Sequence, residues 1–201
     1  MSRTDFYIFR HGETDWNAER RIQGQTRDIP LNARGVAQAK ELAENMKYIP
    51  LDVIYSSPLG RALETAKIVA KTKIIPVVGF DELKEHHYGT AEGKLHSEIT
   101  PAELSACYNV ERDFCFPGGE THFASAARAK NALLLIAEST DAEHIGIASH
   151  RGLIKCLLVH IFGIAGGYEI PHAVPLHVIC DKGNLAMDKA CAGYRALSGQ
   201  R

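Results

Sequence analysis

The residues best suited to chemistry are an arginine and a histidine that follow a short apolar run near the start of the chain. Residues 6–9 (Phe-Tyr-Ile-Phe) lead directly into Arg10, His11 and Gly12. A short apolar run that ends in a turn residue is typical of a buried strand in a parallel sheet. Ligands of open α/β sheets bind just beyond the carboxyl ends of the strands. We therefore expect Arg10 and His11 at such an end, where a histidine could attack a phosphate; the alternative is an ordinary strand with a polar turn.

Three further polar residues come shortly after predicted strands. Arg61 lies in the first turn of a predicted helix, where free N–H groups and the helix dipole favour bound anions. Glu85 lies in a polar loop, and His150 ends a second buried apolar run. Because all parallel strands end at one edge of a sheet, we expect these three residues to lie beside His11. Taken alone, Arg61 could instead be an ordinary surface arginine.

This set of side chains suits phosphoryl transfer, which is catalysed mainly by positioning and electrostatic stabilisation. Arg10 and Arg61 could bind phosphoryl oxygens bidentately, a geometry that lysine lacks. A neutral imidazole could attack phosphorus and form a phosphohistidine. An alkoxide leaving group needs a proton, and we expect Glu85 to supply it and then to activate water.

Strands and helices alternate along the chain, which predicts a parallel sheet covered by helices. The predicted strands are 6–9, 53–56, 74–78 and 145–149, and the predicted helices are 33–47, one begun by Ser57 and Pro58, a short one begun by Thr100, 122–139 and 152–162. Pro76 indicates that 74–78 is an edge strand. Residues 174–180 and 185–188 flank a turn and predict a hairpin, the one antiparallel feature. We expect a single domain over residues 1–201.

Composition argues against several classes of partner. The chain has 201 residues, with 23 Lys and Arg against 24 Asp and Glu, a net charge of −1. This balance gives no electrostatic footprint for nucleic acid or an anionic membrane. No apolar run is long enough to span a membrane, and residues 1–9 lack the apolar core of a signal peptide. We therefore expect neither nucleic acid nor a membrane as partner, and the phosphoryl-transfer residues described above favour a small phosphorylated substrate. We expect a cytoplasmic location, and monomer and homodimer are both open.

Metal or cofactor binding is not indicated by the sequence. The adjacent His86 and His87 do not form a metal-binding signature, and no His-Glu-x-x-His occurs. The five cysteines are scattered, without a Cys-x-x-Cys pair, and are typical of free thiols in a reducing compartment. We expect neither a metal nor a cofactor.

These residues resemble the motifs of the histidine phosphatase superfamily, branch one, also called the phosphoglycerate mutase-like family. The matching stretches are Arg10-His11-Gly12-Glu13-Thr14 with Trp16-Asn17, Ser56-Ser57-Pro58-Leu59 with Arg61-Ala62 and Glu64-Thr65-Ala66, Leu83-Lys84-Glu85 with Gly89 and Glu92-Gly93, Gly118-Gly119-Glu120, and Ser149-His150. They follow the family's order over most of the chain and are jointly very specific. The resemblance implies a three-layer α/β/α sandwich around a mostly parallel sheet with one antiparallel strand.

The same resemblance implies residue roles. His11 would be the phosphorylated nucleophile and Glu85 the proton donor. Arg10, Arg61 and His150 would form the phosphate pocket, and the family needs no metal. The remaining pocket-lining residues that it implies are Asn17, Gln23 and Gly24.

Two departures from the family pattern add cations. Arg151 follows His150, where the family usually has a small residue. The loop between Gly24 and Pro30 is one residue longer than usual, with Arg27 as the apparent extra residue. Because both changes add a positive charge near the expected mouth of the site, they predict a substrate with a second anionic group.

Three functions are compatible with the sequence. The favoured one is a phosphatase of small phosphomonoesters. A cofactor-dependent phosphoglycerate mutase is the first alternative: His86, Tyr88 and Gly89 fit it, but the chain lacks the length of mutases, which carry extra segments that exclude water. A non-catalytic phosphate-binding module is the second, and it would need neither His11 nor Glu85.

Overall fold

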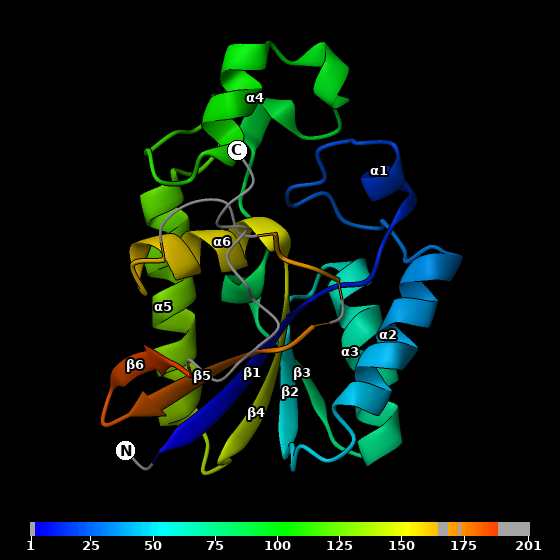
Figure 1. Cartoon of the computed structure of the whole chain (residues 1–201), viewed down its shortest axis with the longest axis vertical. Coiled ribbons are helices and arrows are strands. Elements are labelled where there is room, and N and C mark those ends of the chain that lie inside the picture. The colour runs from blue at the N-terminus through cyan, green and yellow to red at the C-terminus, as the bar shows by residue number, and fades with distance from the viewer. Residues whose placement is uncertain (1–2, 165–168, 173, 189–201) are drawn as a thin grey trace, which may run out of the picture.

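The computed structural model describes residues 3–164, 169–172 and 174–188, and it contains a six-stranded sheet between two layers of helices (Figure 1). The strands are β1 (Thr4–Arg10), β2 (Val53–Ser56), β3 (Val77–Gly79), β4 (His144–Ser149), β5 (Leu176–Asp181) and β6 (Asn184–Met187). Their order across the sheet is β3-β2-β4-β1-β5-β6. The short β3 is an edge strand, as the proline before it predicts. The three-layer α/β/α sandwich is therefore confirmed.

Four neighbouring strands, β3, β2, β4 and β1, are parallel, and β5 alone runs against them. The hairpin that joins β5 to β6 turns at Lys182 and Gly183, both with positive φ (49° and 80°). Two such residues form the tight turn that matches strand twist. The sequence predicts this hairpin correctly, but β5 also pairs antiparallel with β1. One antiparallel strand thus gives two antiparallel pairings.

The central strand β1 is apolar on both faces because helices cover both. Phe6 and Ile8 belong to the core beneath α5 (His122–Ser139) and α6 (Arg151–His160). Phe9 belongs to the opposite core, beneath α2 (Ala33–Asn45) and α3 (Gly60–Lys73). Alternate residues of a strand point to opposite faces. Each fully buried aromatic or aliphatic side chain contributes about 1.5–3 kcal/mol, so both faces anchor the strand that carries Arg10.

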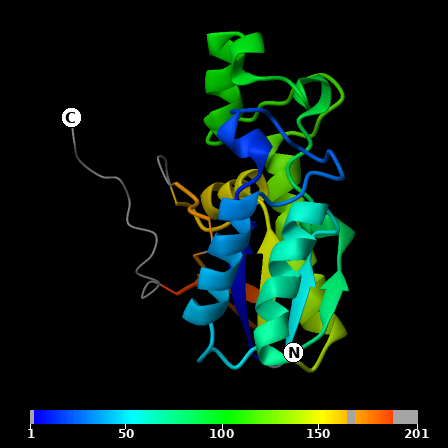
Figure 2. The same ribbon diagram turned by 90° about the vertical axis from the view of Figure 1, so that its right-hand side faces the viewer.

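The remaining helical segments are short and come from the loops at one end of the sheet. They are α1 (Asp15–Ala18), α4 (Pro101–Tyr108) and three 3₁₀ turns, Asp81–Leu83, Gly89–Ala91 and His96–Glu98. Figures 1 and 2 show α1 and α4 together above the sheet, at the end where β1 leads into α1. They therefore wall the region where the strand-end residues were expected.

Predicted boundaries differ from those of the structure by up to three residues, and two of the differences concern the elements around Arg61. The helix that carries Arg61 begins at Gly60 after Leu59, not at Ser57 and Pro58; the Ser57 hydroxyl accepts from the Leu59 N–H at 3.3 Å and also lies 2.8 Å from Nε2 of His150. The predicted strand 74–78 begins only at Val77, because Ile74 adopts a left-handed conformation that ends α3. The predicted helix 122–139 matches α5 at both ends. The short α1, capped by Thr14 and Asn17, was not predicted.

The turn after β1 passes unusually close to α2. A Cβ atom added at Gly12 would lie 2.4 Å from the Gly35 carbonyl oxygen, and one added at Gly35 would lie 2.0 Å from the Glu13 carbonyl oxygen. Real Cβ atoms do not approach backbone oxygens so closely. Both glycines are therefore required for the chain to bring His11 to this position.

The state of the cysteines and the search for membrane-spanning helices and metal sites concern only the described part of the chain. Cys107, Cys115, Cys156 and Cys180 are free thiols, and Cys191 lies outside the described residues. Across the described ranges, no helix is long and apolar enough to cross a bilayer. No cluster of metal-ligating side chains occurs among those same residues.

Replacing Ile74 by glycine should stabilise the protein. Ile74 has φ 56° and ψ 44°, and 95% of its side chain is exposed. Left-handed backbone costs a non-glycine residue about 1–2 kcal/mol, and almost no apolar burial is lost by the change. We expect urea denaturation to show a free energy of unfolding about 1 kcal/mol higher for Ile74→Gly.

The matched control is Lys67→Gly, at an exposed position inside the same helix. There glycine should destabilise by about 1 kcal/mol, because it loosens a regular helical turn. Two substitutions of the same kind in α3 should therefore shift the denaturation midpoint in opposite directions. Equal destabilisation by both would contradict the assignment of strain to Ile74.

Candidate active site

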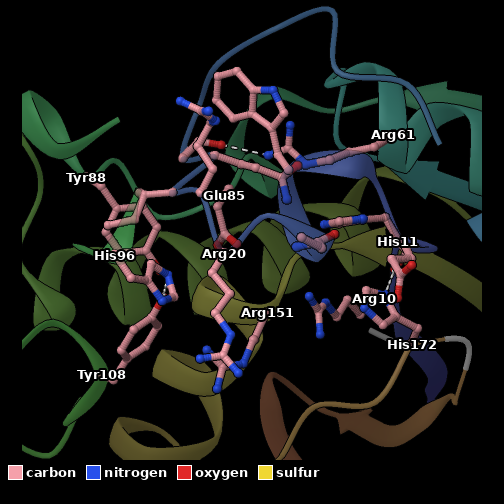
Figure 3. Close-up of a pocket in the computed structure, with 17 residues that line it drawn as sticks. Arg10, His11, Arg20, Arg61, Glu85, Tyr88, His96, Tyr108, Arg151 and His172 are labelled. Atoms are coloured by element: carbon pink, nitrogen blue, oxygen red, sulfur yellow. Dashed lines mark hydrogen bonds between the residues drawn. The ribbon is translucent and has the colours of Figure 1, made fainter. Parts of the chain in front are cut away.

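A pocket of about 260 Å³ lies at the carboxyl ends of the strands (Figure 3). Its lining combines the strand-end residues with residues from α1, α4 and the intervening loops. The lining residues are Arg10, His11, Glu13, Trp16, Asn17, Arg20, Arg21, Ile22, Gln23, Gly24, Arg61, Glu85, Tyr88, His96, Tyr108, Arg151 and His172. Five of them are arginines and two are glutamates, in a chain whose overall charge is −1. The pocket therefore concentrates positive charge that the sequence as a whole does not show.

His11 is held in one tautomer by its own turn. Its Nδ1 lies 2.6 Å from the Gly12 carbonyl oxygen. A carbonyl oxygen can only accept, so Nδ1 carries the proton and Nε2 carries the lone pair. Burial, reinforced by the positive charge of Arg61, lowers the pKa of His11 well below its ordinary value. His11 is therefore a neutral imidazole at neutral pH, with Nε2 as its nucleophilic nitrogen.

His150 lies directly behind His11. The two ring centroids are 5.1 Å apart, and His150 is fully buried at the N-cap of α6. Its Nε2 lies 2.8 Å from the Ser57 hydroxyl, while its Nδ1 is buried without a partner among the described residues. Burial lowers the pKa of His150 well below its ordinary value. His150 thus adjoins the site without lining the pocket surface itself.

Arg10 and Arg61 present buried guanidinium groups that no carboxylate of residues 3–164, 169–172 or 174–188 neutralises in an ion pair. Arg10 donates from Nη1 to the Ile170 carbonyl at 3.0 Å. Arg61 donates to the carbonyls of Gly24 and Thr26, at 2.7 and 3.1 Å. Within the described part of the chain neither forms an ion pair, and both Nε atoms lack a partner. Burial lowers both pKa values to about 10, so both remain charged at neutral pH.

Glu85 reaches the same pocket from the loop after β3. Its Oε1 accepts hydrogen bonds from the backbone N–H groups of His86 and Leu153, at 2.8 and 2.9 Å. Its Oε2 accepts from the Gly152 N–H at 3.2 Å. A Cβ atom at Gly152 would lie 2.7 Å from Oε1, so the carboxyl fits here only because this position is glycine. The first turn of α6 therefore fixes where the carboxyl lies.

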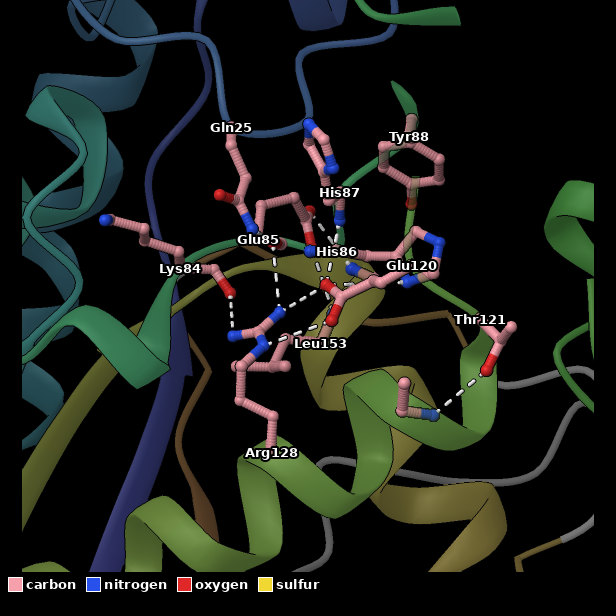
Figure 4. A network of polar contacts seen from close by, with 12 residues as sticks. Gln25, Lys84, Glu85, His86, His87, Tyr88, Glu120, Thr121, Arg128 and Leu153 are labelled. Atoms are coloured by element: carbon pink, nitrogen blue, oxygen red, sulfur yellow. Dashed lines mark hydrogen bonds and ion pairs between the residues drawn. The ribbon is translucent and has the colours of Figure 1, made fainter. Parts of the chain in front are cut away.

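Arg128 of α5 holds the backbone of the Glu85 loop (Figure 4). Its Nη1 donates to the carbonyls of Glu82 and Lys84, at 2.7 and 2.9 Å. Its Nη2 donates to the Glu85 carbonyl at 3.2 Å, and the guanidinium also pairs with the Glu120 carboxylate. One side chain thus binds three carbonyls, which fixes the loop without touching the pocket.

The loop after α1 is tied to the Glu85 loop as well. The Gln25 side-chain amide donates to the Glu85 carbonyl at 3.0 Å, and its backbone N–H donates to Oε1 of Glu92 at 2.9 Å. The same Oε1 accepts from the Tyr88 N–H at 3.0 Å. These contacts close the pocket wall between two segments 60 residues apart.

The structure brings most of the predicted site residues together. His11, Arg10, Arg61, Glu85, Asn17, Gln23, Gly24 and Arg151 line the pocket, and His150 packs against His11. Arg27 does not line it and is exposed in a separate hollow beside Asp15 and Trp16. Because Arg61 binds the carbonyls on either side of Gln25, the loop turns inward there and carries Arg27 outward. The expected cation from Arg27 is therefore missing from the mouth.

Three aromatic pocket residues were not predicted. His172 donates from Nδ1 to the His11 carbonyl at 2.7 Å, and His96 and Tyr108 pair through a 2.7 Å contact between Nε2 and the hydroxyl. His96 and His172 come from segments without apolar periodicity or a known motif, and Tyr108 ends a short helix whose start is predicted but whose direction is not. Only the fold brings them to the site, so the sequence carried no usable signal for them.

Comparisons with known proteins identify the family and the fold. The model for "Histidine phosphatase superfamily (branch 1)" matches residues 6–175. "Uncharacterized phosphatase PhoE" of Bacillus subtilis is 37% identical over 78% of this chain and 76% of its own length. "Probable phosphoglycerate mutase GpmB" of Escherichia fergusonii is 35% identical over 81% of this chain and 77% of its own length. The structure of Bacillus stearothermophilus YhfR superposes with a TM-score of 0.84 and 30% identity, over 92% of this chain and 95% of its own. The chain belongs to the histidine phosphatase superfamily, branch 1.

Stability should depend on pH through a buried histidine beside Glu85. His86 is 2% exposed, and burial lowers its pKa to about 4. In the unfolded chain its pKa is about 6.5, so unfolding takes up a proton between these values. The contribution of neutral His86 to the free energy of unfolding is therefore fully present above about pH 6.5, and it is lost as the pH falls toward 4.

The slope of the free energy of unfolding against pH, measured by urea titration between pH 6.5 and 4, tests this expectation. His86→Gln should reduce that slope by up to about 1.4 kcal/mol per pH unit, the contribution of one proton. The comparison uses the slope, so any general loss of stability in the variant does not affect it. Identical slopes in wild type and variant would show that His86 is not a buried neutral group.

Proposed function

We propose that this member of the superfamily is a phosphatase that hydrolyses small phosphomonoesters through a phosphohistidine on His11, with Glu85 as proton donor. The observation that supports it most is the tautomer of His11, which leaves Nε2 unprotonated in a pocket that two unneutralised arginines share. A pocket of this kind favours a dianion next to a nucleophile. A site that only bound phosphate would gain nothing from that lone pair.

In the first step, the guanidinium groups of Arg10 and Arg61 bind the phosphoryl oxygens and hold phosphorus before Nε2. Both arginines donate only to backbone carbonyls, so their charge is available to the substrate. A nitrogen–phosphorus bond forms as the bond between phosphorus and the ester oxygen breaks. Charge developing on the imidazole is stabilised by the hydrogen bond from Nδ1 to the Gly12 carbonyl.

Glu85 acts on both halves of the reaction. As a carboxylic acid it gives its proton to the departing ester oxygen, which leaves as an alcohol. As a carboxylate it then takes a proton from water, whose oxygen attacks the phosphohistidine and releases phosphate. The N–H groups of Gly152 and Leu153 keep the carboxyl in one place throughout this cycle. His11 and Glu85 both end in their starting states.

A mutase is the second candidate, because a relative of similar identity is named a probable phosphoglycerate mutase. In that case the phosphohistidine would return its phosphoryl group to another hydroxyl instead of to water. Incubation with 3-phosphoglycerate and a trace of bisphosphoglycerate distinguishes the two. Isomerisation that outpaces phosphate release would replace the phosphatase proposal.

A phosphomonoester panel should show separate effects of the two proposed catalytic residues. His11→Ala should abolish turnover, because the variant lacks the Nε2 that attacks phosphorus. Glu85→Gln should lower kcat by about 10²–10⁴-fold, the usual contribution of a general acid, while inorganic phosphate still binds. Initial rates of phosphate release and calorimetric titration with phosphate provide these values.

His87→Ala is the matched control, since this neighbouring histidine lies outside the pocket lining. It should retain wild-type rates. If His11→Ala hydrolysed the panel as well as His87→Ala, the covalent mechanism would be wrong. If no member of the panel were turned over by wild type while phosphate still bound, a non-catalytic phosphate-binding module would be favoured.

A further inference from the structure

The arginines of the pocket fall into two groups, one beside His11 and one farther from it. At the inner end lie His11, Arg10 and Arg61. Arg20 and Arg151 line another part of the pocket, and the view in Figure 3 shows them between the His11 group and the pair formed by His96 and Tyr108. One phosphoryl group at Nε2 would occupy only the inner arginines. The outer part would then be left with two further cations.

Arg151 is oriented but scarcely neutralised. Its guanidinium carbon lies 5.1 Å from the centroid of the Tyr108 ring, which stacks beneath a cation. Among the residues that the structure describes, its one acidic contact is with Oε1 of Glu169 at 3.6 Å, beyond the range of a good hydrogen bond. The Glu169 side chain is 71% exposed, and an ion pair of this kind is weak in water. Arg151 therefore offers a charge that is held in place yet still available.

Arg20 is placed by an unusual backbone. Its φ is 56°, a conformation that costs any residue with a Cβ atom free energy. The backbone is held there by a hydrogen bond from its N–H to the Asn17 carbonyl and by one that its carbonyl accepts from the His96 N–H. In the described part of the chain no ion pair or side-chain hydrogen bond is found for its guanidinium. The strained turn thus serves to keep a free cation at the pocket.

The neighbouring Arg21 differs from Arg20 and Arg151 in the partners of its guanidinium group. It pairs with Glu19 at 3.0 Å, donates to the Gly93 carbonyl at 2.8 Å and lies over the Trp16 ring. Its donors are therefore used within the protein. Arg20 and Arg151 lack such a set of partners.

Arg20 and Arg151 both act electrostatically on His96, in one wall of the pocket. Burial together with the positive charges of these two arginines lowers the pKa of His96, which lines the pocket between segments from α1 and α4. Tyr108 contacts both His96 and Arg151, at 2.7 Å and through its ring face. The two guanidinium groups therefore act on one region of the pocket and not on separate surfaces.

We propose that Arg20 and Arg151 form a second anion site, so that the substrate class is phosphomonoesters that carry another negative group, a carboxylate or a second phosphoryl group. This inference rests on the proposed function only in placing the first phosphoryl group before His11. The sequence predicts that Arg151 and Arg27 recognise a second anionic group of the substrate. In this proposal Arg20 replaces Arg27 as the second of these cations.

Matched pairs of substrates test the second site directly. 3-Phosphoglycerate and glycerol 3-phosphate differ in one carboxylate, and propane-1,3-diol bisphosphate and 3-hydroxypropyl phosphate differ in one phosphoryl group. Wild type should favour the more anionic member of at least one pair by about tenfold or more in kcat/KM, the usual effect of a charged hydrogen bond. The pair that shows the larger ratio identifies the second group as carboxylate or phosphoryl.

Variants that remove one charge show which residues cause the preference for the more anionic substrate. Arg151→Gln and Arg20→Gln should each lower the ratio by about tenfold, while kcat/KM for the less anionic member changes little. Glu169→Gln removes the competing carboxylate and should raise the ratio. Arg27→Gln changes net charge equally but lies outside the pocket, so its ratio should match wild type. Equal losses for both members of each pair, or no preference in wild type, would overturn the second site.

Binding to His11→Ala separates this inference from the proposed function. Calorimetric titration of that variant with 3-phosphoglycerate and glycerol 3-phosphate, and with the second pair, needs no catalysis. If wild type turns over no phosphomonoester but the variant still prefers the more anionic ligands through Arg20 and Arg151, the proposed function fails and the second site stands. If wild type is active and neither titration nor kinetics shows a preference, the second site fails alone.

Discussion

The site depends on keeping positive charge out of water without neutralising it. Arg10 and Arg61 are buried, and burial alone makes a guanidinium costly unless its donors are satisfied. The fold satisfies part of that need with the carbonyls of Ile170, Gly24 and Thr26. A carboxylate in their place would stabilise the arginines better, but it would occupy the position of a substrate anion. Carbonyl partners orient the two groups and leave their charge, and their unpaired Nε atoms, for a ligand.

His11 and Glu85 are likewise held by backbone groups and not by charged side chains. A carbonyl fixes the proton on Nδ1 of His11, and backbone N–H groups seat the Glu85 carboxyl, so neither side chain depends on a charged partner. Glycine makes both arrangements possible, since a Cβ atom at Gly12 or Gly152 would collide with its surroundings. The His11 ring and the Glu85 carboxyl are therefore positioned by main chain, and both face the cations of the pocket.

Much of this could be read from the sequence, and the reasons are physical. Parallel strands share a carboxyl edge, so residues that end apolar runs, such as His11 and His150, must meet once the alternation of strands and helices is recognised. Hydrogen bonds that bridge distant segments could not be read in the same way. Ser57 looked like a helix cap, and its hydroxyl does accept from the Leu59 N–H, but the same hydroxyl also lies beside Nε2 of His150, 93 residues away. Arg27 looked like a pocket cation, but the binding of its loop by Arg61 turns it outward. His96 and His172 come from segments in which no periodicity indicates direction, and Tyr108 ends the short helix α4, whose placement over the site the sequence does not indicate.

The central claim is that Nε2 of His11 becomes covalently bound to phosphorus, and identification of the phosphorylated atom tests it most directly. Brief incubation with a phosphomonoester that is turned over, followed by alkaline quench, peptide mass spectrometry and ³¹P NMR, locates the group. The account predicts acid-labile, base-stable phosphate on His11, attached at Nε2, because Nδ1 is occupied by its bond to the Gly12 carbonyl. Phosphate on Nδ1, on another residue, or on none during steady turnover would contradict it.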